Sequence, residues 1–151
     1  MSKIHDMVPE LEAPAAIWNP TATVNWSLPF TPVFGAWLQM LNWGSLGETE
    51  LAEISKKWFY ASLGMLLLYA IAGLALAGNE AGLLLLRVLP LFYLVTWYLG
   101  SARPHMKYVK ERFGNDYNRR PWKKPLLAAS GLTVMYFALQ FLVGVLFGSA
   151  T

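Results

Sequence analysis

The chain has no cysteine and only two histidines among its 151 residues. Without cysteine it has no disulfide bond and no thiolate metal site, and its redox compartment stays open. The histidines, His5 and His105, stand apart in segments that we expect to face water, so no metal site is predicted. Residues 1–18 carry acidic residues and prolines where a signal peptide needs an apolar stretch, so we expect no cleavage and an uncleaved first span.

Residue patterns for catalysis are also missing. The apolar segments contain no pair of carboxylates, and the chain has neither a set of serine, histidine and acid nor a glycine-rich phosphate loop. We therefore expect no enzymatic activity, no catalytic residue and no cofactor.

Charge is scarce too, because charged residues make up 14% of the chain, against about 25% in an average soluble domain. Hydrophobic residues make up 56% and gather in blocks instead of following an amphipathic period. The blocks are residues 58–77, 81–100 and 125–148, each long enough at about 1.5 Å per residue to cross a hydrocarbon layer about 30 Å thick. Residues 49–57 extend the first block as helix. The sequence thus predicts three transmembrane helices.

A single arginine, Arg87, interrupts the block 81–100. Its insertion cost of about 2.5 to 3.5 kcal/mol is outweighed by about 3 to 7 kcal/mol from leucine, valine and phenylalanine, so the block is expected to span. Only residues 78–80 separate it from the block 58–77, which predicts an antiparallel helical hairpin. Arg87 either snorkels to the interface or pairs with Glu80, or it is an intramembrane cation that faces a partner, a pore or an anionic headgroup.

Residues 22–43 are apolar but interrupted. Pro29 and Pro32 split the segment, and a helix capped by Thr31 and ending before Gly44 has about a dozen residues. That length is too short to cross a bilayer, so we predict a re-entrant or interfacial helix. The alternative is a fourth transmembrane helix, which would move the N-terminus from the cytoplasm to the outside.

Side-chain amides dilute the apolar segments at four positions, Asn25, Gln39, Asn42 and Gln140. Such groups form hydrogen bonds between membrane helices, and we expect this packing role rather than a polar cavity. Gly144 and Gly148 have the small-xxx-small spacing that lets two helix backbones approach, and they predict a homodimer contact. The ends of the predicted spans carry aromatic residues that we assign to an interfacial belt: Trp43, Trp58, Trp97, Tyr98 and Trp122.

Basic residues concentrate between the second and third blocks. Residues 101–124 hold eight of the twelve lysines and arginines, and only Glu111 and Asp116 oppose them. The positive-inside rule places this loop in the cytoplasm, and residues 78–80 and the C-terminus in the periplasm. The residues that we expect to meet anionic lipid headgroups are Arg103, Lys107, Lys110, Arg112, Arg119, Arg120, Lys123 and Lys124.

A short helix is predicted inside this loop, over residues 104–113, and it stops at Gly114. Its Met106, Val109 and Phe113 are expected to rest on the membrane surface. The loop also mixes aromatic residues with cations, but no recognition fold accompanies them, so no nucleic-acid partner is predicted.

Two stretches carry a resemblance, residues 25–50 (NWSLPFTPVFGAWLQMLNWGSLGETE) and residues 55–60 (SKKWFY). They resemble the N-terminal part of small uncharacterised bacterial inner-membrane proteins, in which a similar segment precedes hydrophobic helices. The resemblance covers about a third of the chain. It implies a bacterial inner-membrane location and transfers no catalytic residue.

Residues 1–151 are therefore predicted to form one domain, an all-α integral membrane helical bundle with a polar tail over 1–21. The expected function is that of a non-enzymatic accessory or scaffold of a membrane complex, acting through helix–helix contacts with another protein or with itself. One alternative is an immunity protein against a membrane-targeted toxin. Another is an oligomeric channel or small transporter that uses Arg87 and the amides of residues 22–43.

Overall fold

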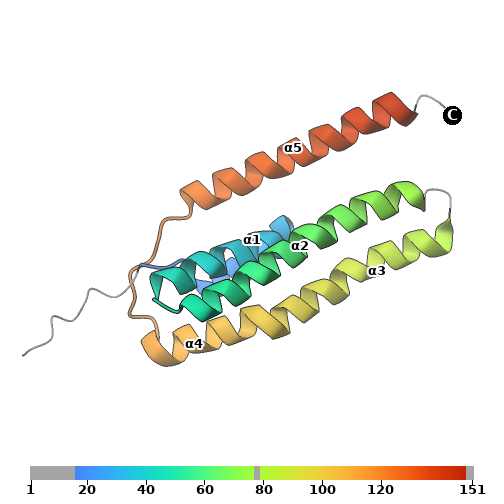
Figure 1. The fold of residues 1–151 in the computed structure, drawn as a ribbon. Helices are drawn as coiled ribbons and strands as arrows, with labels where there is room; N and C mark the ends of the chain where they lie inside the picture. Colours follow the sequence, from blue (N-terminus) through green and yellow to red (C-terminus); the bar gives the residue numbers. More distant parts are fainter. Residues whose placement is uncertain (1–15, 77–78, 149–151) are drawn as a thin grey trace, which may run out of the picture.

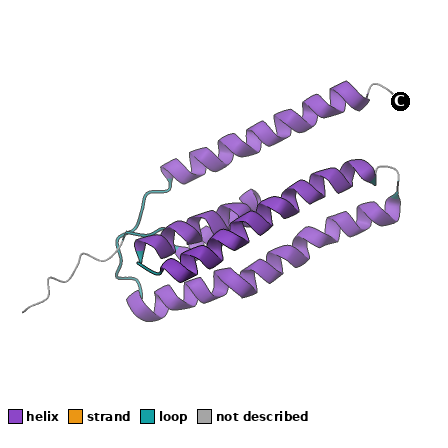
Figure 2. Cartoon of the chain, viewed as in Figure 1, coloured by secondary structure: helices purple, strands orange, loops and turns teal. Residues whose placement is uncertain are grey.

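The computed structural model describes residues 16–76 and 79–148, without the side chains of residues 74, 140, 143, 144 and 146–148. As Figure 1 and Figure 2 show, the chain forms α1 (Pro20–Ser45), α2 (Thr49–Ala75), α3 (Glu80–Trp97), the π-helix η1 (Tyr98–Ala102), α4 (Arg103–Phe113) and α5 (Lys123–Gly148). Over these ranges the one extended pairing is an isolated bridge between Ile17 and Arg119. The predicted all-α fold is confirmed.

The element α1 is a helical hairpin rather than a straight helix. Thr31 has φ 68° and ψ 164°, a backbone conformation that breaks the helix between Pro29 and Pro32. After this break the chain runs back on itself, because the Asn42 side chain hydrogen-bonds the backbone N–H and C=O of Trp18. Both ends of α1 therefore lie at the same end of the molecule.

Close packing joins the two arms of this hairpin. A Cβ atom at Gly35 would lie only 2.2 Å from the Oγ of Ser27 on the first arm. Only a glycine lets the backbones approach so closely. The second arm follows the expected course from Pro32 and ends at Ser45.

The first arm was not predicted as helix. It begins after Asn19, whose side chain accepts a hydrogen bond from Ala22 N at 3.1 Å, and Pro20 occupies the first helical turn. Asparagine followed by proline is a favoured helix start, since the cap satisfies a free N–H and proline lacks the N–H that would remain unpaired. The favoured prediction began the helix at Thr31 and Pro32 and did not use this start signal.

The helices α2 and α3 form the antiparallel hairpin that their short connection predicted. α2 begins at Thr49. α3 begins after Asn79, whose side chain accepts a hydrogen bond from Gly82 N at 3.0 Å. A 2.9 Å hydrogen bond between the hydroxyls of Ser62 and Tyr93 joins the two helices.

The helix α3 does not end where the basic loop was expected to begin. It continues through η1 into α4, so that Glu80–Phe113 is one run of 34 residues, and Gly114 ends it with φ 59°. The wider π-turn lets the helix pass Pro104, which has no N–H to donate. Among the described residues this run is the one helix long and apolar enough to cross a membrane. The predicted short helix over residues 104–113, with its end at Gly114, is confirmed, whereas the expected break between this helix and the block 81–100 was wrong.

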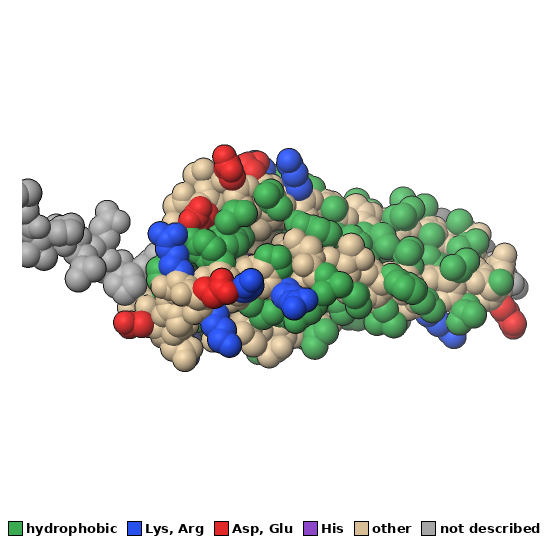
Figure 3. Space-filling model, turned by 90° about the horizontal axis from the view of Figure 1, so that it is seen from below, with side chains coloured by type: hydrophobic (Ala, Val, Ile, Leu, Met, Phe, Trp, Pro, Cys, Tyr) green, Lys and Arg blue, Asp and Glu red, His purple; other side chains and the backbone are tan. Residues whose placement is uncertain are grey.

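The helix α5 stands apart from the other helices along most of its length (Figure 1). It packs near its start, where Ala129 joins Phe34 and Leu38 of α1 in a small buried cluster flanked by Trp122 and Leu126. Figure 3 shows most charged side chains near one end and hydrophobic side chains over the rest of that face. We call this charged end, formed by α4, Trp18, Asn42 and residues 114–122, the basic end.

Candidate functional site

The basic end is organised around Asn42, which is fully buried. Its Oδ1 accepts a hydrogen bond from Trp18 N at 2.9 Å, and its Nδ2 donates to Trp18 O at 2.8 Å. Next to it, Ile17 N donates to Asn118 O and Arg120 N donates to Ile17 O, both at 2.9 Å. Asn42 thus ties the N-terminal segment to α1, and that segment holds the basic loop.

The side chain of Trp18 binds the same loop. Its Nε1 donates to Pro121 O at 3.1 Å, and the guanidinium of Arg120 lies 4.8 Å from the centre of the indole ring. In a similar way, the guanidinium of Arg119 lies 5.8 Å from the centre of the Tyr117 ring. Two of the predicted headgroup contacts are therefore engaged with aromatic rings of the protein.

A second polar contact crosses the bundle at the π-helix. Gln39 is fully buried, and its Oε1 accepts a hydrogen bond from Ser101 Oγ at 2.8 Å. The two residues are 62 positions apart in the sequence. This contact agrees with the expected packing role of the amides, since it joins α1 to the long helix.

His105 was predicted to face water, and this prediction was wrong. The side chain is fully buried in α4, and its ring centre lies 4.7 Å from that of Trp43. The ring lies beyond the apolar block 81–100, and burial lowers its pKa from 6.5 to about 4. Val109, one turn further along, is also buried and does not rest on the membrane surface. The face of α4 that was assigned to lipid is partly the face that packs on α1.

A surface contact closes the basic end. The hydroxyl of Tyr108 donates to the carboxylate of Glu48, and Arg112 Nη1 donates to the Tyr108 oxygen at 2.8 Å. Arg112 Nη1 also lies 3.5 Å from Oε1 of Glu48, an ion-pair distance. Burial raises the pKa of the Tyr108 phenol, and its hydrogen bond to Glu48 raises it further. This contact holds α4 against the turn between α1 and α2.

Two tryptophans assigned to an interfacial belt are instead packed inside the protein. Trp97 is fully buried and Trp43 nearly so. A Cβ atom at Gly35 would lie 2.5 Å from the Trp97 ring, and one at Gly100 would lie 2.8 Å from the Trp58 ring. The large rings fill space left by glycines on facing helices. Residue composition placed the tryptophans at helix ends but did not identify the glycines that face Trp97 and Trp58.

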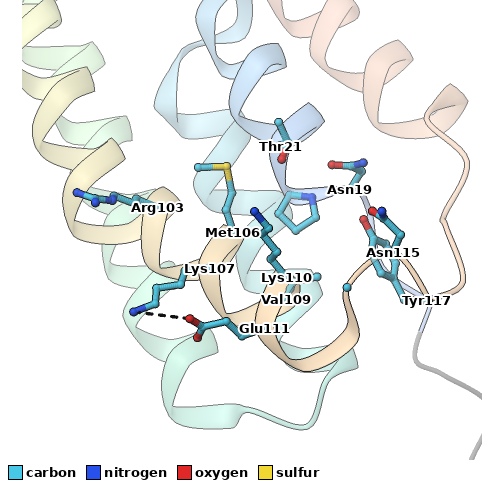
Figure 4. A pocket seen from close by; sticks show the side chains of 12 residues that line it. Asn19, Thr21, Arg103, Met106, Lys107, Val109, Lys110, Glu111, Asn115 and Tyr117 are labelled. Atoms are coloured by element: carbon cyan, nitrogen blue, oxygen red, sulfur yellow. Dashed lines mark ion pairs between the residues drawn. The ribbon is translucent and has the colours of Figure 1, made fainter.

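A pocket of about 820 Å³ lies between α4 and the start of α1 (Figure 4). Arg103, Lys107 and Lys110 line it from α4, and Figure 4 shows Lys110 directed toward the first turn of α1. Lys107 forms an exposed ion pair of 3.8 Å with Glu111. The remaining predicted loop cations, Lys123 and Lys124, are exposed and lie outside this pocket.

The polar residues predicted to lie within the membrane have fewer contacts in the structure than those of the basic end. Arg87 and Glu80 are both exposed, and no ion pair joins them in the part of the chain that the structure describes. Asn25 is also exposed, unlike Gln39 and Asn42. The other candidates in this group, Gln140, Gly144 and Gly148, belong to α5, but their side-chain surroundings lie outside the described residues.

No group of three or more potential metal ligands occurs among the described residues. No family model matches the chain, and no similar protein was found among the curated proteins or the solved structures. The site is therefore defined by its geometry alone. Sequence reasoning identified Gln39 and Asn42 but missed their partners Ser101 and Trp18, because nothing local in the sequence links positions so far apart.

Proposed function

We propose that this chain is an integral inner-membrane protein that serves, without catalysis, as an accessory or scaffold of a membrane complex. It acts through contacts of α5 with a helix of another protein or of a second copy. The observation that carries the proposal is the separation of α5, which packs on α1 only near Ala129 in the part of the chain described here. The apolar side chains that α5 leaves exposed include Leu132, Val134, Met135, Phe137, Leu139, Phe141 and Leu142.

The proposed placement has three spans, with the basic end in the cytoplasm and residues 78–80 in the periplasm. The long apolar helix and the concentration of cations from Arg103 onward, at the C-terminal end of this helix and beyond it, support this orientation. The α1 hairpin supports a re-entrant segment over residues 22–43, because its two ends meet at Trp18 and Asn42. Its arms, of about 16 and 21 Å at 1.5 Å per residue, are each shorter than the hydrocarbon layer.

Single cysteines test this placement in a chain that has none of its own. Thr21, Gly44 and Asn115 are exposed near the basic end, and Asn79 is exposed at the other end. In intact cells an impermeant thiol reagent should label the Asn79→Cys variant and spare the other three until the inner membrane is opened. Labelling of Thr21→Cys from outside, with Gly44→Cys protected, would instead require a fourth span.

A photoreactive amino acid tests the partner contact directly. Phe137 of α5 and Phe92 of α3 are 64% and 69% exposed, so the two positions are matched in side chain and exposure. The probe at Phe137 should crosslink to a protein, either a second copy or another membrane protein, whereas the probe at Phe92 should crosslink mainly to lipid. Lipid adducts alone at both positions would remove the scaffold proposal and leave a monomeric membrane protein.

A further inference from the structure

The pocket between α4 and the start of α1 has the chemistry of an anion site. Of its charged lining residues, Arg103, Lys107 and Lys110 are cations and Glu111 is the one acid. Glu111 pairs with Lys107, and among the described residues no ion pair engages Arg103 or Lys110. The pocket therefore keeps two uncompensated positive charges on one helix face.

Neutral donors surround these charges. Asn19 and Asn115 contribute side-chain amides and Tyr117 a hydroxyl, and all three lie across the pocket from α4 in Figure 4. The pocket also lies against the first turn of α1, where Pro20 and Thr21 are part of its lining. The positive end of the α1 helix dipole adds to the field of Lys110, which favours an oxyanion with several acceptor atoms.

The volume and the position of the pocket limit the kind of ligand that it can bind. A volume of about 820 Å³ falls within the range of about 300 to 1,000 Å³ that is usual for small-molecule pockets. Arg103 is only three residues beyond the apolar block 81–100, so the pocket begins about 5 Å further along the helix. That is the level of lipid headgroups when the block crosses the bilayer.

We propose that this pocket binds a phosphate ester anion, the group shared by anionic lipid headgroups and soluble phosphate esters. Lys110 points from α4 toward the first turn of α1, and Arg103 lines the pocket at its outer edge. The proposal rests on the membrane placement proposed above but not on a partner for α5. It remains distinguishable from that function, because binding is measured on the purified chain while the partner contact is measured in cells.

The test uses the full chain in a neutral detergent, with water-soluble dihexanoyl phosphatidylglycerol as the probe and calorimetry or native mass spectrometry as the readout. The double variant R103Q/K110Q should bind this lipid about 25-fold more weakly, since each cation near an anionic surface contributes about fivefold. The matched control is K123Q/K124Q, which removes the same charge from the same side of the membrane but outside the pocket. It should bind within about twofold of the unchanged chain.

Competitors identify the source of the phosphate. Displacement of the lipid by low-millimolar inorganic phosphate would assign the site to soluble phosphate esters, and resistance to displacement would assign it to lipid headgroups. Dihexanoyl phosphatidylcholine, which has no net charge, should bind weakly. Equal losses in the two double variants, or equal binding of the two lipids, would overturn the proposal, because the attraction would then be diffuse or independent of charge. All four substituted side chains are exposed, so a melting curve should show unchanged folding.

Discussion

In the second arm of α1, toward the basic end, Gln39 and Asn42 are fully buried and hydrogen-bonded to partners far away in the sequence. Toward the other end of the same bundle, Leu85 and Phe92 are 71% and 69% exposed. The first region is held by directional contacts between polar groups. The second presents apolar side chains outward and has few directional contacts to hold it.

This difference has a physical meaning in a membrane. Lipid tails solvate leucine as well as another helix does, so apolar side chains alone do not fix how helices are arranged. Buried hydrogen bonds and close glycine contacts do fix it, because alternatives leave polar groups unpaired or rings overlapping. We therefore expect substitutions at the buried hydrogen bonds and close glycine contacts to change stability strongly, and substitutions at the exposed positions of α3 to change it little.

The largest effect is expected at Gly35. A Cβ atom there would lie 2.2 Å from Ser27 Oγ and 2.5 Å from the Trp97 ring. Gly35→Leu should lower the free energy of unfolding by more than about 3 kcal/mol, since neither the opposite arm nor a buried indole has room to move. Unfolding is measured in mixed detergent micelles, with tryptophan fluorescence as the signal.

Gly44 is the matched control on the same helical element, because nothing lies within 4 Å of the Cβ position there. Gly44→Leu should leave stability unchanged or raise it slightly, since glycine is the poorer helix former. Similar losses at both positions would mean that the hairpin arms do not pack closely.

The next effect is expected at Asn42. Asn42→Leu preserves volume but leaves the N–H and C=O of Trp18 without their partner, at a cost of about 2 to 3 kcal/mol. The same change at Asn25, which is exposed, should be neutral or favourable in lipid or detergent. If Asn25→Leu proved as costly as Asn42→Leu, burial of the Asn42 amide would not be what organises the basic end.

A third effect depends on pH and on His105. Burial lowers the folded-state pKa to about 4, below the unfolded value of 6.5, so the unfolded chain binds the extra proton first as the pH falls. Stability should be constant above pH 6.5 and decline between pH 6.5 and 4, by about 2 kcal/mol at pH 5. His105→Phe keeps the ring against Trp43 and should remove this decline. His5 is present in both the unchanged protein and the His105→Phe variant. If the two proteins lost stability equally as the pH falls, the decline would belong to groups other than His105.

Much of the helical content could be predicted because each helix depends on local signals. The apolar blocks, the Asn79 start of α3 and the Gly114 end of α4 are all readable from neighbouring residues. The packed face of α4 could not be predicted in this way. Met106, Val109 and Phe113 form a plausible apolar stripe, but Val109 is buried, and so is His105, against which Trp43 packs from more than 60 positions earlier.

The candidate site illustrates the same limit. Asn42 and Gln39 stood out because amides are rare in apolar segments, and both are indeed buried. Their partners, Trp18 and Ser101, carry no such signal, since one contributes only backbone atoms and the other is a common small residue. The pocket is equally hidden in sequence, because its walls come from α4 and from the first arm of α1, which was not predicted as helix.

The smallest effect is expected at Arg87, on the exposed surface of α3. Its side chain is exposed and has no ion pair within the described ranges, so Arg87→Leu should change the free energy of unfolding by less than about 0.5 kcal/mol. Arg112→Leu is the matched control, since it removes a hydrogen bond to Tyr108 and an ion pair with Glu48 and should cost about 1 kcal/mol.

Because Arg87 faces outward, ion flux into liposomes should also be the same with and without the Arg87→Leu substitution. A large loss of stability or of flux in Arg87→Leu alone would place a directional contact in the apolar region, and the contrast between the two regions would no longer hold.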